Sequence, residues 1–279
     1  ADPAAHIQAT GRDVKGRKQY RYHPDWTACR DEAKFFTLTA FGQGLPELRA
    51  QVARDLRKRS LARERVIASV VLLLDDTMIR IGNEAYAREN RSFGLTTLRR
   101  RHVDVEGSQL RFSFRGKSGQ EWNLRLRVRR LASVMRSLQD LPGQRLFQYE
   151  GEDGPRPVHS HDVNDYIRAA MGPDFTTKHF RTWGATKAAA FRLGSTPLPD
   201  TKHQQTVVLN ACIDKVARQL RNTRAVCRRC YIHPRVTEGW LAGQLQEEMR
   251  ELSRRYRRPL DGLDREETIL LRWLEQQAD

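Results

Sequence analysis

The hydrophobic pattern of this 279-residue chain is helical over most of its length and changes to a strand pattern in one short stretch. Apolar and polar residues alternate in residues 102–105, 110–114 and 122–128, with glycine-containing turns between these runs. A period of two is typical of strands with one buried face, and short turns between three such runs indicate an antiparallel meander. We therefore expect an α+β protein that is mainly helical and carries one small antiparallel three-stranded sheet.

Apolar residues at helical spacing predict helices on both sides of this sheet. Before it, residues 31–91 are expected to be helical: one helix opens at Leu45-Pro-Glu-Leu48, a second runs from Arg63 to Arg80 and stops at Gly82, and a short third runs from Glu84 to Glu89. After the sheet, helices are expected at about 131–140, 161–171, 177–193, 203–220, 236–256 and 265–277.

The first 30 residues have the composition of a small β unit. A turn-rich segment, residues 11–16, precedes Gln19-Tyr-Arg-Tyr22, which alternates as a strand does. Because a lone hairpin is rarely stable, this unit is expected to belong to something larger or to pack on the body. We expect residues 1–30 to be a fragment of a small β unit and residues 31–279 to form the main domain.

The balance of charges indicates a polyanionic partner. The chain has 50 Lys and Arg against 34 Asp and Glu, a formal charge of +16, and a field of that sign attracts nucleic acid. A membrane surface would also attract it. However, the longest apolar stretch, Val66–Leu74, is far shorter than the roughly 20 residues that span a bilayer. Hydrophobic residues make up 39% of the chain, which suffices for a sizeable core and argues against disorder.

The amino end has no secretory signal, so a cytoplasmic protein is expected. In that compartment the four cysteines (Cys29, Cys212, Cys227 and Cys230) are expected to be reduced thiols.

Five segments, in this order along the chain, resemble the small poxviral and bacterial branch of the type IB DNA topoisomerases. They are Ile79–Tyr86, Asn90–Leu98, Phe114–Gly119, Lys178–Trp183 and Val226–Pro234. The resemblance runs from about Gly11 to about Gly239. It implies that residues 31–279 form the catalytic domain that type IB topoisomerases share with tyrosine recombinases. It also implies that residues 1–30 are the C-terminal part of a β-rich N-terminal clamp domain, which closes over duplex DNA. It also implies a bacterial protein that acts on the nucleoid as a monomer.

The resemblance implies a nucleophile and three cationic partners. Tyr231 matches the tyrosine that forms a 3′-phosphotyrosyl bond to DNA, Arg80 and Arg181 match the two phosphate-clamping arginines, and Lys117 matches the general acid for the 5′-oxygen. The residue types suit this chemistry, because a guanidinium donates two hydrogen bonds to one phosphate and nearby cations help a phenol to ionise. Two arginines supply the charge that metal ions supply in many nucleases. We therefore expect no metal cofactor, and no ATP, since one phosphodiester is exchanged for another.

The chain departs from the poxviral pattern at a fourth position. Where that pattern has histidine in a Gly-His-Thr segment, this chain has Leu220-Arg-Asn-Thr223, so Asn222 replaces the histidine and Arg221 replaces the glycine. Asparagine donates a neutral N–H to a phosphate oxygen but cannot gain or lose a proton. We expect cleavage to show no histidine titration from this position.

Further DNA contacts follow from the same resemblance. Tyr86 and Lys178 match family positions that contact DNA, and Tyr20 and Tyr22 match a tyrosine pair of the clamp domain. Since glycines flank Lys117, we also expect its turn to be mobile and to bring the lysine to the site only when DNA is bound.

Other interpretations compete with this one. A tyrosine recombinase shares the chemistry, but it usually has His-x-x-Arg at the second arginine, where this chain has Lys178, and substantial helices follow Tyr231 here. A basic architectural DNA-binding protein would not need an ordered set of motifs. Arg80 could be an ordinary helix C-terminal cation. Cys227, Cys230 and His233 invite a zinc interpretation, but no second ligand pair stands at a suitable spacing.

Overall fold

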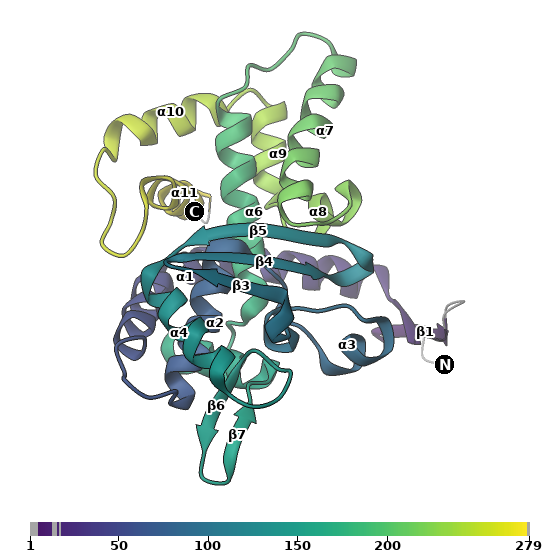
Figure 1. The fold of residues 1–279 in the computed structure, drawn as a ribbon. Helices are drawn as coiled ribbons and strands as arrows, with labels where there is room; N and C mark the ends of the chain where they lie inside the picture. Colours follow the sequence, from purple (N-terminus) through teal and green to yellow (C-terminus); the bar gives the residue numbers. More distant parts are fainter. Residues whose placement is uncertain (1–4, 13–15, 17, 278–279) are drawn as a thin grey trace.

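The structure, a computed structural model, describes residues 5–12, 16 and 18–277, and for residues 18, 25 and 27–34 it describes the backbone alone (Figure 1). Residues 13–15 of the expected turn and the side chain of Cys29 lie outside this description. The helices are α1 (Pro24–Asp55), α2 (Arg63–Thr77), α3 (Glu84–Asn90), α4 (Arg129–Asp140), α5 (Ser160–Met171), α6 (Thr177–Gly194), α7 (Lys202–Gln219), α8 (Arg224–Cys230), α9 (Pro234–Leu241), α10 (Leu245–Arg255) and α11 (Arg265–Gln276).

The expected α+β fold with its three-stranded antiparallel sheet is confirmed. Strands β3 (Val103–Glu106), β4 (Gln109–Arg115) and β5 (Glu121–Arg127) pair in sequence order. Alternate residues of β4 (Leu110, Phe112 and Phe114) are buried, which is the pattern that the period of two predicts. In Figure 1 helices α7, α8 and α9 lie above this sheet, and α2, α4 and the hairpin of β6 (Gln148–Gly151) and β7 (Gly154–Pro157) lie below it.

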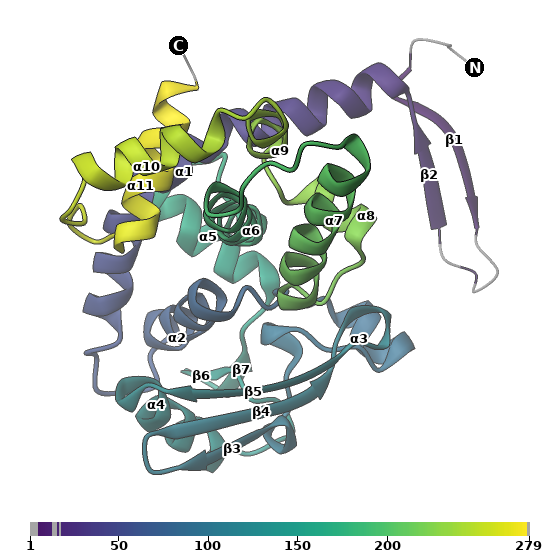
Figure 2. The same cartoon turned by 90° about the horizontal axis from the view of Figure 1, so that it is seen from above.

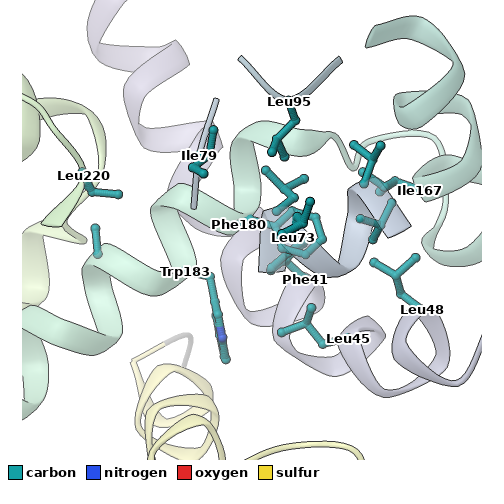
Figure 3. Packing of buried hydrophobic residues seen from close by; sticks show 14 of the residues in the cluster. Phe41, Leu45, Leu48, Leu73, Ile79, Leu95, Ile167, Phe180, Trp183 and Leu220 are labelled. Carbon is teal, nitrogen blue, oxygen red and sulfur yellow. The ribbon is translucent and has the colours of Figure 1, made fainter. Parts of the chain in front are cut away.

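The core lies where α1, α2 and α6 meet. Phe41, Leu73 and Phe180 come together there from these three helices (Figure 3). Gly42 lets α1 approach α6 closely, because a Cβ atom at this position would lie 2.4 Å from the indole of Trp183. This packing holds α6, which carries Arg181, against α2, which leads into Arg80.

Helix α1 differs from the sequence prediction. The structure has one helix from Pro24 to Asp55 with Pro46 inside it, whereas a helix start was expected near Leu45 and helical structure only from about residue 31. Proline removes one backbone hydrogen bond and disfavours a helix interior. Leu45 and Leu48 are almost fully buried on either side of Pro46, so tertiary packing of this helix outweighs the local cost.

Other boundaries were also wrong. Helix α2 ends at Thr77, because Met78 adopts a left-handed conformation and donates its N–H to the Leu74 carbonyl. The segment expected as one helix over 236–256 forms α9 and α10, which are separated by a turn containing Gly243 with a φ of +75°. The hairpin β6–β7 and the short helix α8 were not predicted.

The first hairpin, β1 (Ile7–Arg12) with β2 (Lys18–Tyr22), stands at the start of α1 and projects from the rest of the molecule (Figure 2). Helix α1 begins two residues after β2, earlier than the expected domain boundary at residue 30. Within the described part of the chain, no helix combines the length and the hydrophobicity needed to cross a membrane.

Candidate active site

Six of the predicted site residues line one cavity of about 390 Å³. They come from segments that are far apart in the sequence, and the fold brings them together. The six are Arg80, Tyr86, Lys117, Lys178, Arg181 and Tyr231.

Arg80 lies on an extended segment that follows α2 and runs beside residues 94–97. The amide of Leu95 donates to the carbonyl of Arg80 (2.9 Å), and the amide of Thr96 donates to the carbonyl of Ile81 (2.8 Å). Gly94 is needed for this contact, because a Cβ atom there would lie 2.5 Å from the Arg80 carbonyl oxygen. The arginine is thus held by backbone pairing beyond the helix, and not at a helix end as expected.

Arg181 is the most deeply buried of the charged site residues, with 3% of its surface exposed. Its guanidinium donates hydrogen bonds to the carbonyls of Met78 and Leu220 (2.9 Å for Leu220), on the segments that precede Arg80 and Asn222. Burial, and then repulsion from Arg80, lower its pKa to about 10. At neutral pH it therefore remains a buried cation that joins these two segments.

Tyr231 caps the C-terminal end of α8 and is partly buried. Its amide donates to the carbonyl of Cys227 (3.0 Å), and its ring lies 4.9 Å from the guanidinium of Arg181. Burial alone would raise the pKa of Tyr231, but the positive charges of Arg181 and Arg80 outweigh burial and lower it below the usual value of 10. The site therefore favours the ionised phenol, which is the nucleophilic form.

Thr186 was not predicted and holds the backbone around Tyr231. Its hydroxyl is fully buried, donates to the carbonyl of Tyr231 and accepts from the amide of His233, both at 3.1 Å. A threonine on a helix gives no sequence signal for such a role, because its two partners are about 45 residues away in the chain.

Asn222 lies in the loop between α7 and α8. Its Oδ1 accepts a hydrogen bond from Arg80, and its Nδ2 is buried without a partner. An unpaired buried donor is unfavourable unless something accepts from it. Arg221 has a φ of 51°, so it takes the left-handed conformation that a glycine readily adopts.

Lys117 lies in the turn between β4 and β5, and its side chain is exposed. It already lines the cavity. This counts against the expectation that the lysine reaches the site only when DNA is bound.

The remaining predicted DNA contacts fall into two groups. Tyr86 and Lys178 are exposed at the cavity. Tyr20 and Tyr22 stack on each other in β2, with ring centroids 6.1 Å apart, and do not line the cavity. The structure does not bring these two tyrosines to the site.

The cysteines beside Tyr231 are not arranged as metal ligands. Cys227 is fully buried, and burial raises the pKa of its thiol to about 12, while Cys230 is partly exposed. Over the described residues, no group of three or more His, Cys, Asp or Glu side chains could hold a metal ion.

Comparison with known proteins shows which family this chain is similar to. A family model described as "Eukaryotic DNA topoisomerase I, catalytic core" matches residues 18–256. DNA topoisomerase 1B of Acanthamoeba polyphaga mimivirus is 36% identical over 239 residues, which is 83% of this chain and 71% of the viral protein. DNA topoisomerase 1B of Vaccinia virus (strain Copenhagen) is 25% identical over 107 residues, 38% of this chain and 34% of the viral protein. These relatives are viral, so the expected bacterial origin is not supported.

Proposed function

The chain belongs to the type IB DNA topoisomerase family, and we propose that it relaxes both positive and negative supercoils in duplex DNA. It cuts one strand, lets the duplex turn about the intact strand, and reseals the cut. One observation carries the proposal: Arg80, Lys117, Arg181 and Tyr231 line the same cavity.

In the cleavage step, Tyr231 loses its proton to solvent and its phenolate oxygen attacks one phosphodiester. A bond forms between this oxygen and phosphorus, and the bond from phosphorus to the 5′-oxygen breaks. Lys117 donates the proton that the leaving 5′-oxygen needs. The products are a 3′-phosphotyrosyl bond and a free 5′-hydroxyl group.

Two arginines and one amide stabilise the charge on the phosphate oxygens. Donors aimed at charge that develops in a transition state are worth about 3–4 kcal/mol each. The buried, unpartnered Nδ2 of Asn222 supports its role as a neutral donor in this group. The guanidiniums take the part that metal ions play in many nucleases, and the reaction therefore needs no metal.

Resealing is the reverse of cleavage. The 5′-hydroxyl attacks the phosphotyrosyl bond, Lys117 takes back the proton, and Tyr231 leaves. Because one phosphodiester replaces another, the cycle is nearly neutral in energy and needs no ATP.

Duplex DNA is held mainly through its phosphates. The net charge of +16 and the exposed Lys178 at the cavity support this mode of binding. Affinity for DNA is then expected to fall steeply with salt, because each neutralised phosphate releases counterions. We propose that the protein acts as a monomer, since one chain supplies every residue of the site.

The test is relaxation of supercoiled plasmid in the presence of chelator and without ATP. Wild-type protein should relax plasmids of either handedness, and Tyr231→Phe should bind DNA but leave it supercoiled. Tyr256→Phe is the matched control, because Tyr256 lies at the end of α10 and should retain full activity. Trapping the covalent adduct and mapping the attached peptide should identify Tyr231.

The same assay separates the alternatives. Strands joined between two different DNA molecules would favour a recombinase. Binding without any strand cleavage would favour an architectural protein and would contradict the proposal.

A further inference from the structure

The loop that carries Asn222 and strand β5 meet at a contact that the mechanism does not use. The guanidinium of Arg221 lies 5.9 Å from the ring centre of Trp122, within the range of a cation–π interaction. Arg221 immediately precedes Asn222, and Trp122 lies on β5, just beyond the turn that carries Lys117.

The side chain of Trp122 packs against the turn that carries Lys117. It is 7% exposed and stacks on Phe114, with the two rings 6.0 Å apart and nearly parallel. The backbone of Gly116 rests on the indole, since a Cβ atom there would lie 2.8 Å from its Nε1 atom. The position of the indole therefore determines where the backbone just before Lys117 can lie.

The contact between Arg221 and Trp122 completes a set of interactions that connects the segments of the site to one another. On one side, Asn222 accepts from Arg80, whose segment pairs with the residues after Gly94. On the other side, the amide of Phe93 donates to the carbonyl of Arg115 (2.8 Å), at the start of the Lys117 turn. Arg221 on Trp122 joins the Asn222 loop directly to the Lys117 turn.

The left-handed backbone of Arg221 (φ of 51°) ends α7, and the amide of Asn222 donates to the carbonyl of Ala217 (2.8 Å) across this turn. Glycine adopts this conformation readily, so it can replace Arg221 without changing the course of the loop. The loop geometry and the contact with Trp122 can therefore be tested separately.

We propose that Arg221 and Trp122 are positioning residues, which hold the Lys117 turn against the Asn222 loop so that the proton donor faces the leaving 5′-oxygen. This inference rests on the proposed topoisomerase reaction. Neither residue is among those that line the cavity, so both would act through Lys117.

The central variant is Arg221→Gly, because glycine keeps the left-handed backbone and removes only the guanidinium. Single-turnover cleavage at saturating DNA should slow roughly fivefold to tenfold, the effect expected from losing an exposed or partly desolvated cation–π contact. Arg221→Lys should also slow cleavage, since lysine keeps the charge but lacks a plane to stack on the indole. Arg218→Ala removes a nearby exposed charge that does not contact Trp122 and should leave the rate unchanged.

The deciding measurement uses DNA with sulfur in place of the bridging 5′-oxygen at the cleavage site. A thiol has a pKa near ~8.5 and leaves as a thiolate, so it does not need the proton from Lys117. On this substrate Arg221→Gly should cleave within about twofold of the wild-type rate, as expected if only general-acid catalysis is impaired. An equal loss on both substrates, or full activity of Arg221→Lys on the oxygen substrate, would overturn the inference.

A second arm tests the partner. Trp122→Phe should slow cleavage on its own, and adding it to Arg221→Gly should cost less than the product of the two single losses, because the two variants remove the same contact. Independent, multiplicative losses would overturn the inference. Failure of the proposed function would look different: wild-type protein would form no covalent adduct with either substrate.

Discussion

The guanidinium of Arg181 lies 4.9 Å from the ring centre of Tyr231, and only 3% of this arginine is exposed. A buried cation next to a phenol lowers the free energy of the phenolate more than an exposed one, because water screens it less. The pKa of Tyr231 is accordingly below its usual value of 10, although burial acts in the opposite direction.

This arrangement predicts the pH dependence of cleavage. The single-turnover rate should rise with pH as Tyr231 ionises and then reach a plateau. The midpoint of this rise should lie below pH 10. Arg181→Ala should move the midpoint upward and by more than Arg80→Ala does, because Arg181 has the larger effect on this phenol. The profile is measured with DNA at saturation, so that weaker binding does not contribute. Equal midpoints in wild type and Arg181→Ala would contradict the assignment.

Asn222 leads to a second prediction. Asn222→Ala removes a neutral donor to the phosphate and should slow cleavage about 100-fold, the usual loss for one oxyanion donor. Asn222→His should restore part of the rate and introduce a new titration near pH ~6.5, the ordinary value for histidine. The pH–rate profiles of both variants and wild type check this. If wild type already shows a step near that pH that is lost only when Asn222 is changed, the prediction fails.

Six of the residues that the sequence analysis named line one cavity, but their local structure was predicted less well. Ile79 is buried and continues the apolar pattern of α2, so the pattern predicted a helix as far as Arg80. In the structure the helix ends at Thr77, because Met78 adopts a left-handed backbone conformation. The spacing of hydrophobic residues carries no information about this conformation. The buried segment after it is extended, and buried extended residues are as apolar as buried helical ones.

Individual hydrogen bonds between residues far apart in the chain could not be predicted from the sequence. The orientation of the Asn222 amide depends on Arg80, which is 142 positions away. The hairpin β6–β7 was missed because Pro155 and Pro157 lie in its second strand, and proline normally argues against one. The Lys117 turn was predicted correctly, because alternation and flanking glycines are local signals.

Gly94 allows a test of how Arg80 is held. Gly94→Ala would place a methyl group 2.5 Å from the Arg80 carbonyl oxygen, and the segment must move. The expected loss of stability is about 1–3 kcal/mol, as for other overpacked sites. Cleavage should fall roughly 100-fold, because a displacement of about 1 Å in a catalytic group has such an effect.

The matched control is Gly11→Ala, where a Cβ atom would meet nothing within 4 Å. Its unfolding free energy should stay within about 0.5 kcal/mol of wild type, as for most surface substitutions. Urea unfolding and cleavage assays on both variants test the pair. A Gly94→Ala protein with wild-type cleavage would show that Arg80 does not depend on this contact.

The buried imidazole of His102 is expected to make the folded protein less stable in acid. It is 8% exposed, packs between Phe93 and Phe114, and accepts a hydrogen bond on Nδ1 from the amide of Arg99 (3.1 Å). Burial, with the charges of Arg101 and Arg99, lowers its pKa from 6.5 to about 4. Above pH 6.5 the imidazole is neutral in both the folded and the unfolded chain, so its contribution to stability is then complete.

As the pH falls from 6.5 to 4, the unfolded chain takes up a proton on this imidazole and the folded chain does not. The free energy of unfolding should therefore drop by up to ~3 kcal/mol from this group across that window.

His102→Asn, whose amide oxygen can accept from Arg99, should be less stable at pH 7.5 but should lose less stability between pH 7.5 and 5. His203→Asn on the exposed side of α7 is the control and should follow wild type. The pKa of His233 is also lowered to about 4, so part of the acid sensitivity should remain in His102→Asn. Urea denaturation at the two pH values measures the difference, and an unchanged pH dependence in His102→Asn would rule out His102 as its source.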